Sequence, residues 1–198
     1  MLMIDISLPL KRGIIAYPGD AQYEEYEYYT HEKDHVHIMR VIMETHSGTH
    51  FDAPFHMLPD GKKAGEIDLR KFMGKATVIE VPGDSIEASA IPENPTEILL
   101  FKTKNSGLYD SFHEDFTYLS PEAAKKIASK KVNLVGIDYL SIEKFGSPEP
   151  VSHKTLMRSD IVIVEGLLLS NVKPGVYDFV CLPLSMGEDG APCRAVLL

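Results

Sequence analysis

The sequence has little cysteine and no surplus of basic charge, and each shortage excludes a class of protein. Only Cys181 and Cys193 are present, without a CxxC pair, so neither a disulfide framework nor a zinc ribbon is indicated and two free buried thiols are expected. The 20 basic and 29 acidic residues give a formal net charge of −9. This balance argues against a nucleic-acid partner, because phosphate backbones attract clusters of Lys and Arg.

Long apolar runs and nucleotide-binding motifs are also missing. No stretch approaches the roughly 18 apolar residues of a membrane-spanning helix. The first residues, MLMIDISLPLKRGI, have no basic segment before an apolar run of signal-peptide length, so we expect a cytoplasmic protein without a membrane partner. No GxGxxG or Walker sequence supports a nucleotide-binding fold, and no GxSxG motif supports a serine nucleophile.

The composition is that of a globular protein. The chain has 198 residues, 44% of them hydrophobic, which is the length of one domain with a full core. No internal repeat, low-complexity tract or Gly/Ser linker divides it. A single domain over residues 1–198 is therefore expected.

Strands dominate the predicted secondary structure. Residues 33–46 carry apolar groups at both parities, which predicts a strand buried on both faces. The tyrosine-rich residues 22–30 predict an edge strand, with a binding role as the alternative. Further apolar runs bounded by Pro, Gly or Asn predict strands at 76–83, 97–103, 132–138, 161–169, 176–184 and 194–198.

Two helices are expected between these strands. LSPEAAKKIASK offers Ser120 as the N-cap and Pro121 at the first helical position, followed by an apolar stripe. A shorter helix, VSHKTLMRSD, has Ser152 as a candidate cap and carries His153 in its opening turn. The order of elements predicts an α/β protein with a mixed sheet rather than a regular doubly wound one.

Histidine is the unusual residue, since six of the eight lie in the first third of the chain. The segment THSGTHFDAPFH (45–56) places His46, His50 and Asp52 at even positions. An extended chain would aim all three at one face, whereas a helix would rotate the aspartate away. Two imidazoles and one carboxylate suit zinc, and also manganese or iron, and they leave coordination positions open.

The same segment supplies a candidate acid or base. Ser47 replaces the glutamate that an HExxH helix would use, so the base must come from elsewhere. Pro54 should bend the chain and bring His56 near the metal, where it need not be a ligand, while Gly48 would allow a close backbone approach to whatever occupies the site. Three more histidines lie outside this spacing and are expected to be solvated: His31, His35 and His37.

Two later residues are candidates for further metal ligands. Glu165 interrupts the apolar run IVIVEGLLL, where an unpaired buried carboxylate would cost several kcal/mol, so it needs a partner such as a metal. A surface bend at this point is the alternative. His153, twelve residues upstream, could reach the same place from the short helix, or could be an ordinary first-turn residue.

THSGTHFDAPFH resembles the HxGTHxDxPxH signature of the cyclase family of metal-dependent hydrolases, whose best-known members are bacterial kynurenine formamidases. The resemblance continues through DFTYLSPEAAKKIA, LVGIDYLSIE, the segment around His153, IVIVEGLLL, VKPGVYDFVCLPL and GEDGAPCRAVLL, and so covers nearly the whole chain. It implies a compact mixed-sheet β/β/α fold of the swivelling type, assembled as a homodimer or a higher homo-oligomer.

The resemblance also implies roles for individual residues. The chain would bind one or two divalent ions, with Asp52 able to bridge from the first to a second. Zinc is the first choice of metal and manganese the second, and His56 would be the catalytic acid or base. Tyr17 stands where formamidases that act on formylkynurenine typically carry a tryptophan, and would keep an aromatic wall against the substrate. The residues that would hold the ions are His46, His50, Asp52, His153 and Glu165.

The implied activity is the hydrolysis of a small amide, with N-formylkynurenine giving kynurenine and formate as the leading reaction. A metal ion would activate water, and His56 would carry a proton to the leaving nitrogen. The alternatives are hydrolysis of a cyclic amide or lactam, a metal-stabilised scaffold without catalysis, and an interaction protein that uses the tyrosine-rich strand. Arg194 and residues 102–110 are candidate substrate contacts, with loop or core roles as alternatives.

Overall fold

The computed structural model describes residues 3–198, and none of the helices in this part is long and apolar enough to cross a membrane. The α-helices are α1 (His31–Asp34), α2 (Pro121–Ala128) and α3 (Val151–Arg158). The strands are β1 (Ile4–Asp5), β2 (Glu24–Tyr29), β3 (Ile38–Ile42), β4 (His50–Asp52), β5 (Met73–Glu80), β6 (Ser85–Ile86), β7 (Ile98–Lys102), β8 (Tyr118–Leu119), β9 (Leu134–Ile137), β10 (Val162–Glu165), β11 (Gly175–Pro183) and β12 (Gly190–Leu197). Single 3₁₀ turns lie at Pro54–His56, Ala64–Glu66, Leu69–Phe72, Ala88–Ala90 and Lys104–Gly107.

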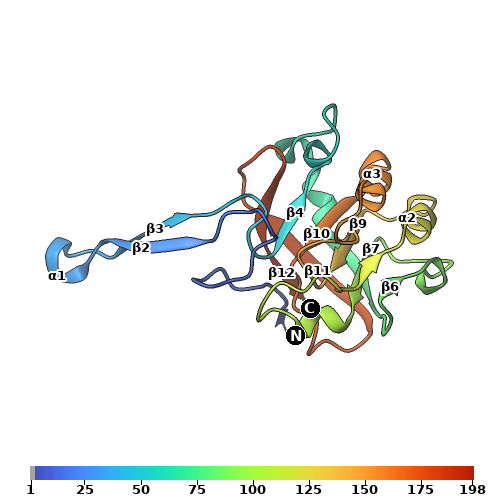
Figure 1. Cartoon of the computed structure of the whole chain (residues 1–198), viewed down its shortest axis with the longest axis horizontal. Helices are drawn as coiled ribbons and strands as arrows, with labels where there is room; N and C mark the ends of the chain where they lie inside the picture. Colours follow the sequence, from blue (N-terminus) through green and yellow to red (C-terminus); the bar gives the residue numbers. More distant parts are fainter. Residues whose placement is uncertain (1–2) are drawn as a thin grey trace.

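The main sheet closes on itself into a barrel of seven strands (Figure 1). Its order is β12-β11-β5-β7-β9-β10-β4, with a further pairing of β4 to β12 and with β1 added beside β12. β5, β7, β9 and β10 are parallel, whereas β11, β12 and β4 pair antiparallel to their neighbours. The predicted mixed α/β sheet is confirmed, and its closure is a feature that local sequence patterns did not predict.

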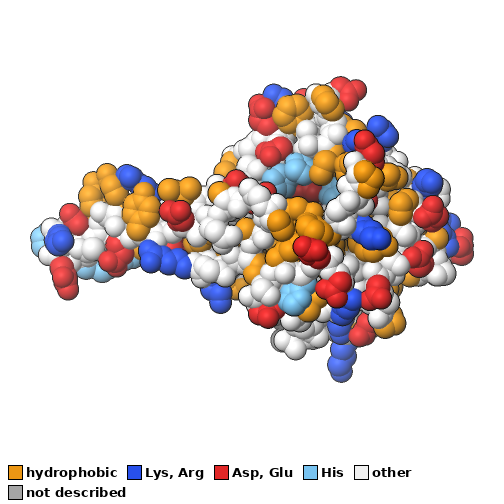
Figure 2. Space-filling view, viewed as in Figure 1, with side chains coloured by type: hydrophobic (Ala, Val, Ile, Leu, Met, Phe, Trp, Pro, Cys, Tyr) orange, Lys and Arg blue, Asp and Glu red, His pale blue; other side chains and the backbone are white. Residues whose placement is uncertain are grey.

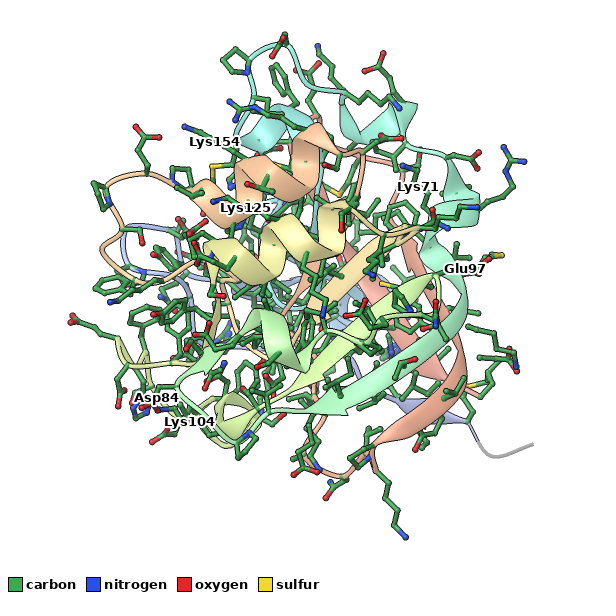
Figure 3. All side chains as sticks on the ribbon, turned by 90° about the vertical axis from the view of Figure 1, so that its right-hand side faces the viewer. Lys71, Asp84, Glu97, Lys104, Lys125 and Lys154 are labelled. Carbon is green, nitrogen blue, oxygen red and sulfur yellow. The ribbon has the colours of Figure 1, made fainter. Side chains whose placement is uncertain are left out.

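The parallel strands β7, β9 and β10 are buried on both faces, which explains their largely apolar sequences. In β7, Ile98 and Leu100 belong to the core inside the barrel, while Leu99 and Phe101 belong to a second core outside it. Helices α2 and α3 lie side by side over this outer core (Figure 3). The predicted strands at 76–83, 97–103, 132–138, 161–169, 176–184 and 194–198 all fall on barrel strands.

The first predicted helix is confirmed and the second needs a correction. In α2, the Ser120 side chain accepts a hydrogen bond from the Ala123 amide at 3.2 Å, and Pro121 begins the helix. In α3, the residue at the N-cap is Pro150, which has no side chain that can cap. Ser152 is therefore not the cap, because it lies one residue inside the helix and donates its hydroxyl to the Leu119 carbonyl.

A ribbon formed by β2, α1 and β3 projects far from the barrel (Figure 1), and we call residues 24–42 the arm. β2 and β3 pair only with each other, in register Glu24↔Ile42 to Tyr29↔Ile38. The predicted strand at 33–46 is thus wrong in extent and in burial, because β3 is exposed along its whole length. Apolar residues at both odd and even positions are compatible with a strand buried on both faces, but equally with a ribbon that is exposed on both faces.

Candidate active site

Three of the predicted site residues lie on the outer surface of the barrel, on adjacent strands β4 and β10. These strands pair antiparallel, with Glu165 opposite His50. Phe51 and Val164 belong to the core inside the barrel, so the alternation of side chains turns His50, Asp52 and Glu165 to the outside. All three are almost fully buried there, because α3 and the loop before it cover this face.

His46 joins this group from a turn rather than from an extended strand. The Ser47 amide donates to the Glu44 carbonyl at 3.2 Å, and Gly48 has a φ of +68°. The parity prediction therefore holds for His50 and Asp52 but is wrong for His46. A Cβ on Gly48 would lie 2.8 Å from the Leu10 side chain, so the close backbone approach that this glycine permits is to another part of the chain.

The two oxygens of Asp52 face different histidines. Oδ1 lies 2.9 Å from His46 Nδ1 and 3.5 Å from His50 Nε2, whereas Oδ2 lies 3.5 Å from His153 Nε2. Glu165 is divided in the same way, with Oε2 at 3.5 Å from His50 Nε2 and Oε1 at 3.2 Å from His153 Nε2. The structure thus brings together all five residues predicted as metal ligands, with Asp52 in the middle.

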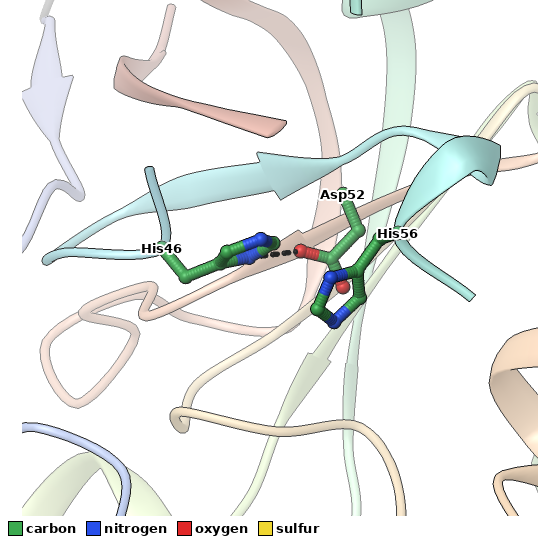
Figure 4. Close-up of side chains that lie close together, drawn as sticks. All are labelled: His46, Asp52 and His56. Atoms are coloured by element: carbon green, nitrogen blue, oxygen red, sulfur yellow. Dashed lines mark hydrogen bonds and ion pairs between the residues drawn. The ribbon is translucent and has the colours of Figure 1, made fainter. Parts of the chain in front are cut away.

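His56 lies beside this group on the 3₁₀ turn that follows β4 (Figure 4). The bend predicted at Pro54 is present, because Pro54 begins the turn. The His56 ring centroid is 4.2 Å from that of His46. One ring nitrogen of His56, one of His46 and one carboxylate oxygen of Asp52 all lie within 4.8 Å of one another. His56 is the exposed member of the site.

When no cation is bound, the buried carboxylates favour additional protons on the histidines. Burial would lower the pKa of His50, but hydrogen bonds to Asp52 and Glu165 outweigh it and raise that pKa well above its usual range. The pKa of His153 is raised for the same reason. Burial would raise the pKa of Asp52, but hydrogen bonds from three histidines hold it well below its usual range. A cluster of imidazoles and carboxylates that demands positive charge fits a divalent cation.

Each of the three buried or half-buried histidines has a partner on its other ring nitrogen. His50 Nδ1 donates to the Gly48 carbonyl at 3.0 Å, and His46 Nε2 lies 3.2 Å from Asp189 Oδ2. His153 Nδ1 lies 3.3 Å from Glu143 Oε2. Sequence reasoning missed both carboxylates, because neither interrupts an apolar run; their only signal is that they fall in the family blocks LVGIDYLSIE and GEDGAPCRAVLL.

The histidines form the floor of a cavity of about 490 Å³. Figure 2 shows histidine and carboxylate atoms together in a hollow of the body. Tyr17 lines this cavity, as the sequence predicted, and its ring packs against Phe112 and Phe145 at centroid distances of 5.3 and 5.9 Å. The Tyr17 ring therefore lies on the wall of the cavity that also contains the metal-ligand candidates, and two rings that do not themselves line the cavity support it.

The remaining predicted residues lie elsewhere. Arg194 pairs with Asp5 through Nε at 3.0 Å, and neither it nor residues 102–110 line the cavity, so their alternative, structural roles are favoured. Cys181 is buried but Cys193 is only partly so, with 3.1 Å between their sulfurs and no disulfide, which corrects the expectation of two buried thiols. The three histidines expected to be solvated are exposed on the arm.

Comparison with known proteins places the chain in a family. The cyclase family profile matches residues 4–144, and the chain belongs to this family. It is 36% identical to the kynurenine formamidase of Bacillus cytotoxicus and 34% identical to that of Bacillus cereus, over 98% of this chain and 96% of each relative.

Solved structures give the same assignment. A potential metal-dependent hydrolase with cyclase activity superposes with a TM-score of 0.86 at 32% identity, covering 99% of this chain and 96% of that one. A predicted metal-dependent hydrolase from Bacillus stearothermophilus gives 0.84 at 33% identity, covering 99% and 97%. The isatin hydrolase A of Labrenzia aggregata shares the fold, with a TM-score of 0.83 at 19% identity over 99% and 93%. The class predicted from the sequence, a metal-dependent hydrolase of the cyclase family, is confirmed.

Proposed function

We propose that this protein hydrolyses the amide bond of N-formylkynurenine, releasing kynurenine and formate. The observation that carries the proposal is the cavity itself, in which a floor of three histidines and Glu165, joined by the buried Asp52, shares the space with a wall that carries the Tyr17 ring. Such a floor can hold metal, and such a wall can hold an aryl ring. The kynurenine formamidases that match almost the whole chain supply the particular substrate.

The proposed metal positions follow from the division of oxygens on Asp52. His46, His50 and Oδ1 would hold one ion, while His153, Glu165 and Oδ2 would hold a second. The mixed nitrogen and oxygen donors favour zinc, with manganese second. A bound divalent ion supplies Lewis acidity, which makes water nucleophilic near neutral pH and polarises the substrate carbonyl.

His56 is the proposed proton carrier. Although His56 is the most open member of the site, partial desolvation of its ring lowers its pKa, which favours the neutral form that can accept a proton from the attacking water. Its place at the edge of the cavity, beyond His46, allows it to pass that proton to the leaving nitrogen. No serine or cysteine nucleophile is needed in this scheme.

A substrate panel tests the proposal. We expect metal-loaded protein to hydrolyse N-formylkynurenine faster than non-aryl formamides, cyclic imides or lactams, when rates are compared by kcat/KM. Tyr17→Ala should reduce the preference for the aryl substrate roughly tenfold, as expected for the loss of an aromatic contact, without loss of metal. Turnover of a lactam with none of N-formylkynurenine would overturn the formamidase assignment and favour the cyclic-amide alternative. Failure of every carbonyl substrate would favour a scaffold.

We further propose that the protein is a homo-oligomer that covers the arm. A two-stranded ribbon is at best marginally stable alone in water, yet Tyr28, Ile38 and Ile42 are 47%, 45% and 50% exposed on it. A second copy is the favoured partner, because two-fold symmetry would bury both arms at once. The two ends of the arm also lead directly into the cavity wall, through Tyr23 and Glu44.

Light scattering after size-exclusion chromatography tests this assembly. We expect a mass of at least two chains for the wild type and of one chain for the double variant Ile38→Lys/Ile42→Lys. Leu69→Lys is the matched control, because it places the same charge on an exposed apolar residue of the body. A wild type that runs as a monomer would overturn the proposed oligomer.

We also propose that the protein is located in the cytoplasm, and cell fractionation tests this location.

A further inference from the structure

Glu143 contacts one end of α3 and one of the proposed metal ligands with the same oxygen. Oε2 accepts hydrogen bonds from the backbone amides of Ser152 at 3.0 Å and His153 at 3.1 Å, and it lies 3.3 Å from His153 Nδ1. The side chain is 12% exposed, so it meets the wall of the cavity but is mostly enclosed.

These contacts make Glu143 the cap of α3. The first amides of a helix have no partner within it, and Pro150 at the N-cap offers no side-chain acceptor. A carboxylate from outside the helix satisfies two of these amides, and its negative charge is favourable at a helix N-terminus. The opening turn that carries His153 is thereby held in place.

The same carboxylate also selects how the His153 ring is turned. A ring whose Nδ1–H donates to a carboxylate keeps its lone pair on Nε2. Nε2 is the atom that faces the metal site, at 3.2 Å from Glu165 Oε1 and 3.5 Å from Asp52 Oδ2. Rotation of the ring would break the contact with Glu143 and remove Nε2 from this position.

The contacts of Glu143, His153 and Glu165 form a closed ring of interactions. Its Oε1 accepts a hydrogen bond from the Ile142 amide at 2.6 Å, and the next residue along the chain is Glu143. Glu143 holds His153, and Nε2 of His153 returns to the same Oε1 of Glu165. The loop and the helix are therefore fixed relative to each other by the residues that would bind the second ion.

We propose that Glu143 is a positioning residue that presents His153 Nε2 to the second metal position and so sets the affinity of that position. The inference rests on the proposed ligand set. Partners of this kind on metal-binding histidines typically change metal affinity about 10- to 100-fold when they are removed. His46 and His50 have other partners, so the first position should not depend on Glu143.

Zinc titration of the metal-free full chain against a chromophoric chelator tests this directly. We expect Glu143→Ala to weaken the second ion about 10- to 100-fold and to leave the first within about twofold. The affinity of Glu143→Gln for the second ion should lie between that of the wild type and that of Glu143→Ala. Its amide oxygen can still accept hydrogen bonds from the helix, but the side chain carries no charge. Glu149→Ala is the matched control, since it removes an exposed carboxylate just before the same helix.

An NMR measurement adds a signature that a merely structural role would not produce. In the zinc-loaded protein, the His153 Nδ1 proton should be slowly exchanging and shifted downfield by its carboxylate partner, and both features should be lost in Glu143→Ala. Unchanged affinity for the second ion, or equal weakening of both ions with the ring signal intact, would overturn the inference. If Glu143→Ala does not fold, Glu143→Gln decides by the same readouts.

His153→Ala separates this inference from the proposal on which it rests. Loss of the second ion in His153→Ala with full binding in Glu143→Ala would overturn the positioning role alone. A wild type that binds one ion, with an affinity unaffected by His153→Ala, would overturn the second metal position and the inference with it. Hydrolysis of N-formylkynurenine is measured separately and does not enter either result.

Discussion

At the scale of single residues, the site consists of buried carboxylates and imidazoles that stabilise one another. Asp52 and Glu165 are 1% and 3% exposed, and each contacts two or more imidazoles. A buried carboxylate that loses its partner costs several kcal/mol. Removal of one histidine should therefore disturb its neighbours as well as its own contact, and this is the basis of the two residue-scale predictions.

Replacement of His50 by Ala should remove metal and activity together. Its Nε2 lies 3.5 Å from an oxygen of Asp52 and 3.5 Å from an oxygen of Glu165, so its removal takes a partner from both buried carboxylates. We expect zinc content, measured by elemental analysis after gel filtration, to fall below that of the wild type, with at least tenfold weaker binding. His37→Ala, on the arm, should bind normally. Full metal content in His50→Ala would exclude it as a ligand.

Replacement of His56 by Ala should separate metal binding from catalysis. His56 is exposed at the edge of the cavity and contacts the site through the face of His46. We expect most of the metal to remain and the rate to fall on the order of a hundredfold or more, as for a lost general acid or base. Parallel elemental analysis and kinetics check this. Metal loss as large as in His50→Ala would make His56 a ligand instead.

At the scale of elements, a sequence pattern that fits only one kind of element predicted that element well. A pattern that fits both a buried strand and an exposed one did not. The segment LSPEAAKKIASK combines a cap, a first-position proline and an apolar stripe, and α2 forms as predicted. The apolar residues of 33–46 carry no indication of what covers them. They form an exposed ribbon because the chain around them leaves the barrel, and no local pattern records that departure.

The cap of α2 gives a prediction for stability. Ser120→Ala should lower the free energy of unfolding by about 1 kcal/mol, because the Ala123 amide loses its buried acceptor. The urea midpoint should fall while the slope m stays constant. Ser129→Ala, at the other end of the helix, changes an exposed hydroxyl and should cost less than about 0.5 kcal/mol. Equal effects at both ends would argue against the cap.

At the scale of the whole molecule, metal and fold should stabilise each other. The ligand candidates join β4, β10 and α3, so an ion would link three elements that are distant in the sequence. Zinc at a hundred times its dissociation constant adds about 2.7 kcal/mol to stability, which for a chain of this length is roughly 5–11 °C in Tm.

Calorimetry checks this prediction. Chelator-treated protein should unfold at a lower temperature, and added zinc should restore the wild-type value. His50→Ala should show little response to zinc, since its site is incomplete. A Tm that is the same with and without metal would show that the site contributes nothing to folding.

Residues close in sequence determined much of this protein by themselves. The HxGTHxDxPxH segment indicated the family, the alternation of β4 placed His50 and Asp52 on one face, and apolar runs marked the barrel strands. These features depend on backbone periodicity, which acts over a few residues and is visible in the chain.

The tertiary structure decided the rest, because it depends on contacts between distant segments. β12 closes the barrel by pairing with β4. The turn at Gly48 directs the His46 side chain to Asp52, which the alternation of side chains along a strand would not explain. Glu143 and Asp189 reach the outer nitrogens of their histidines across 10 and 143 residues of chain. A carboxylate in a loop has no periodic pattern, so only the packing of the loop against the barrel shows which ring it meets.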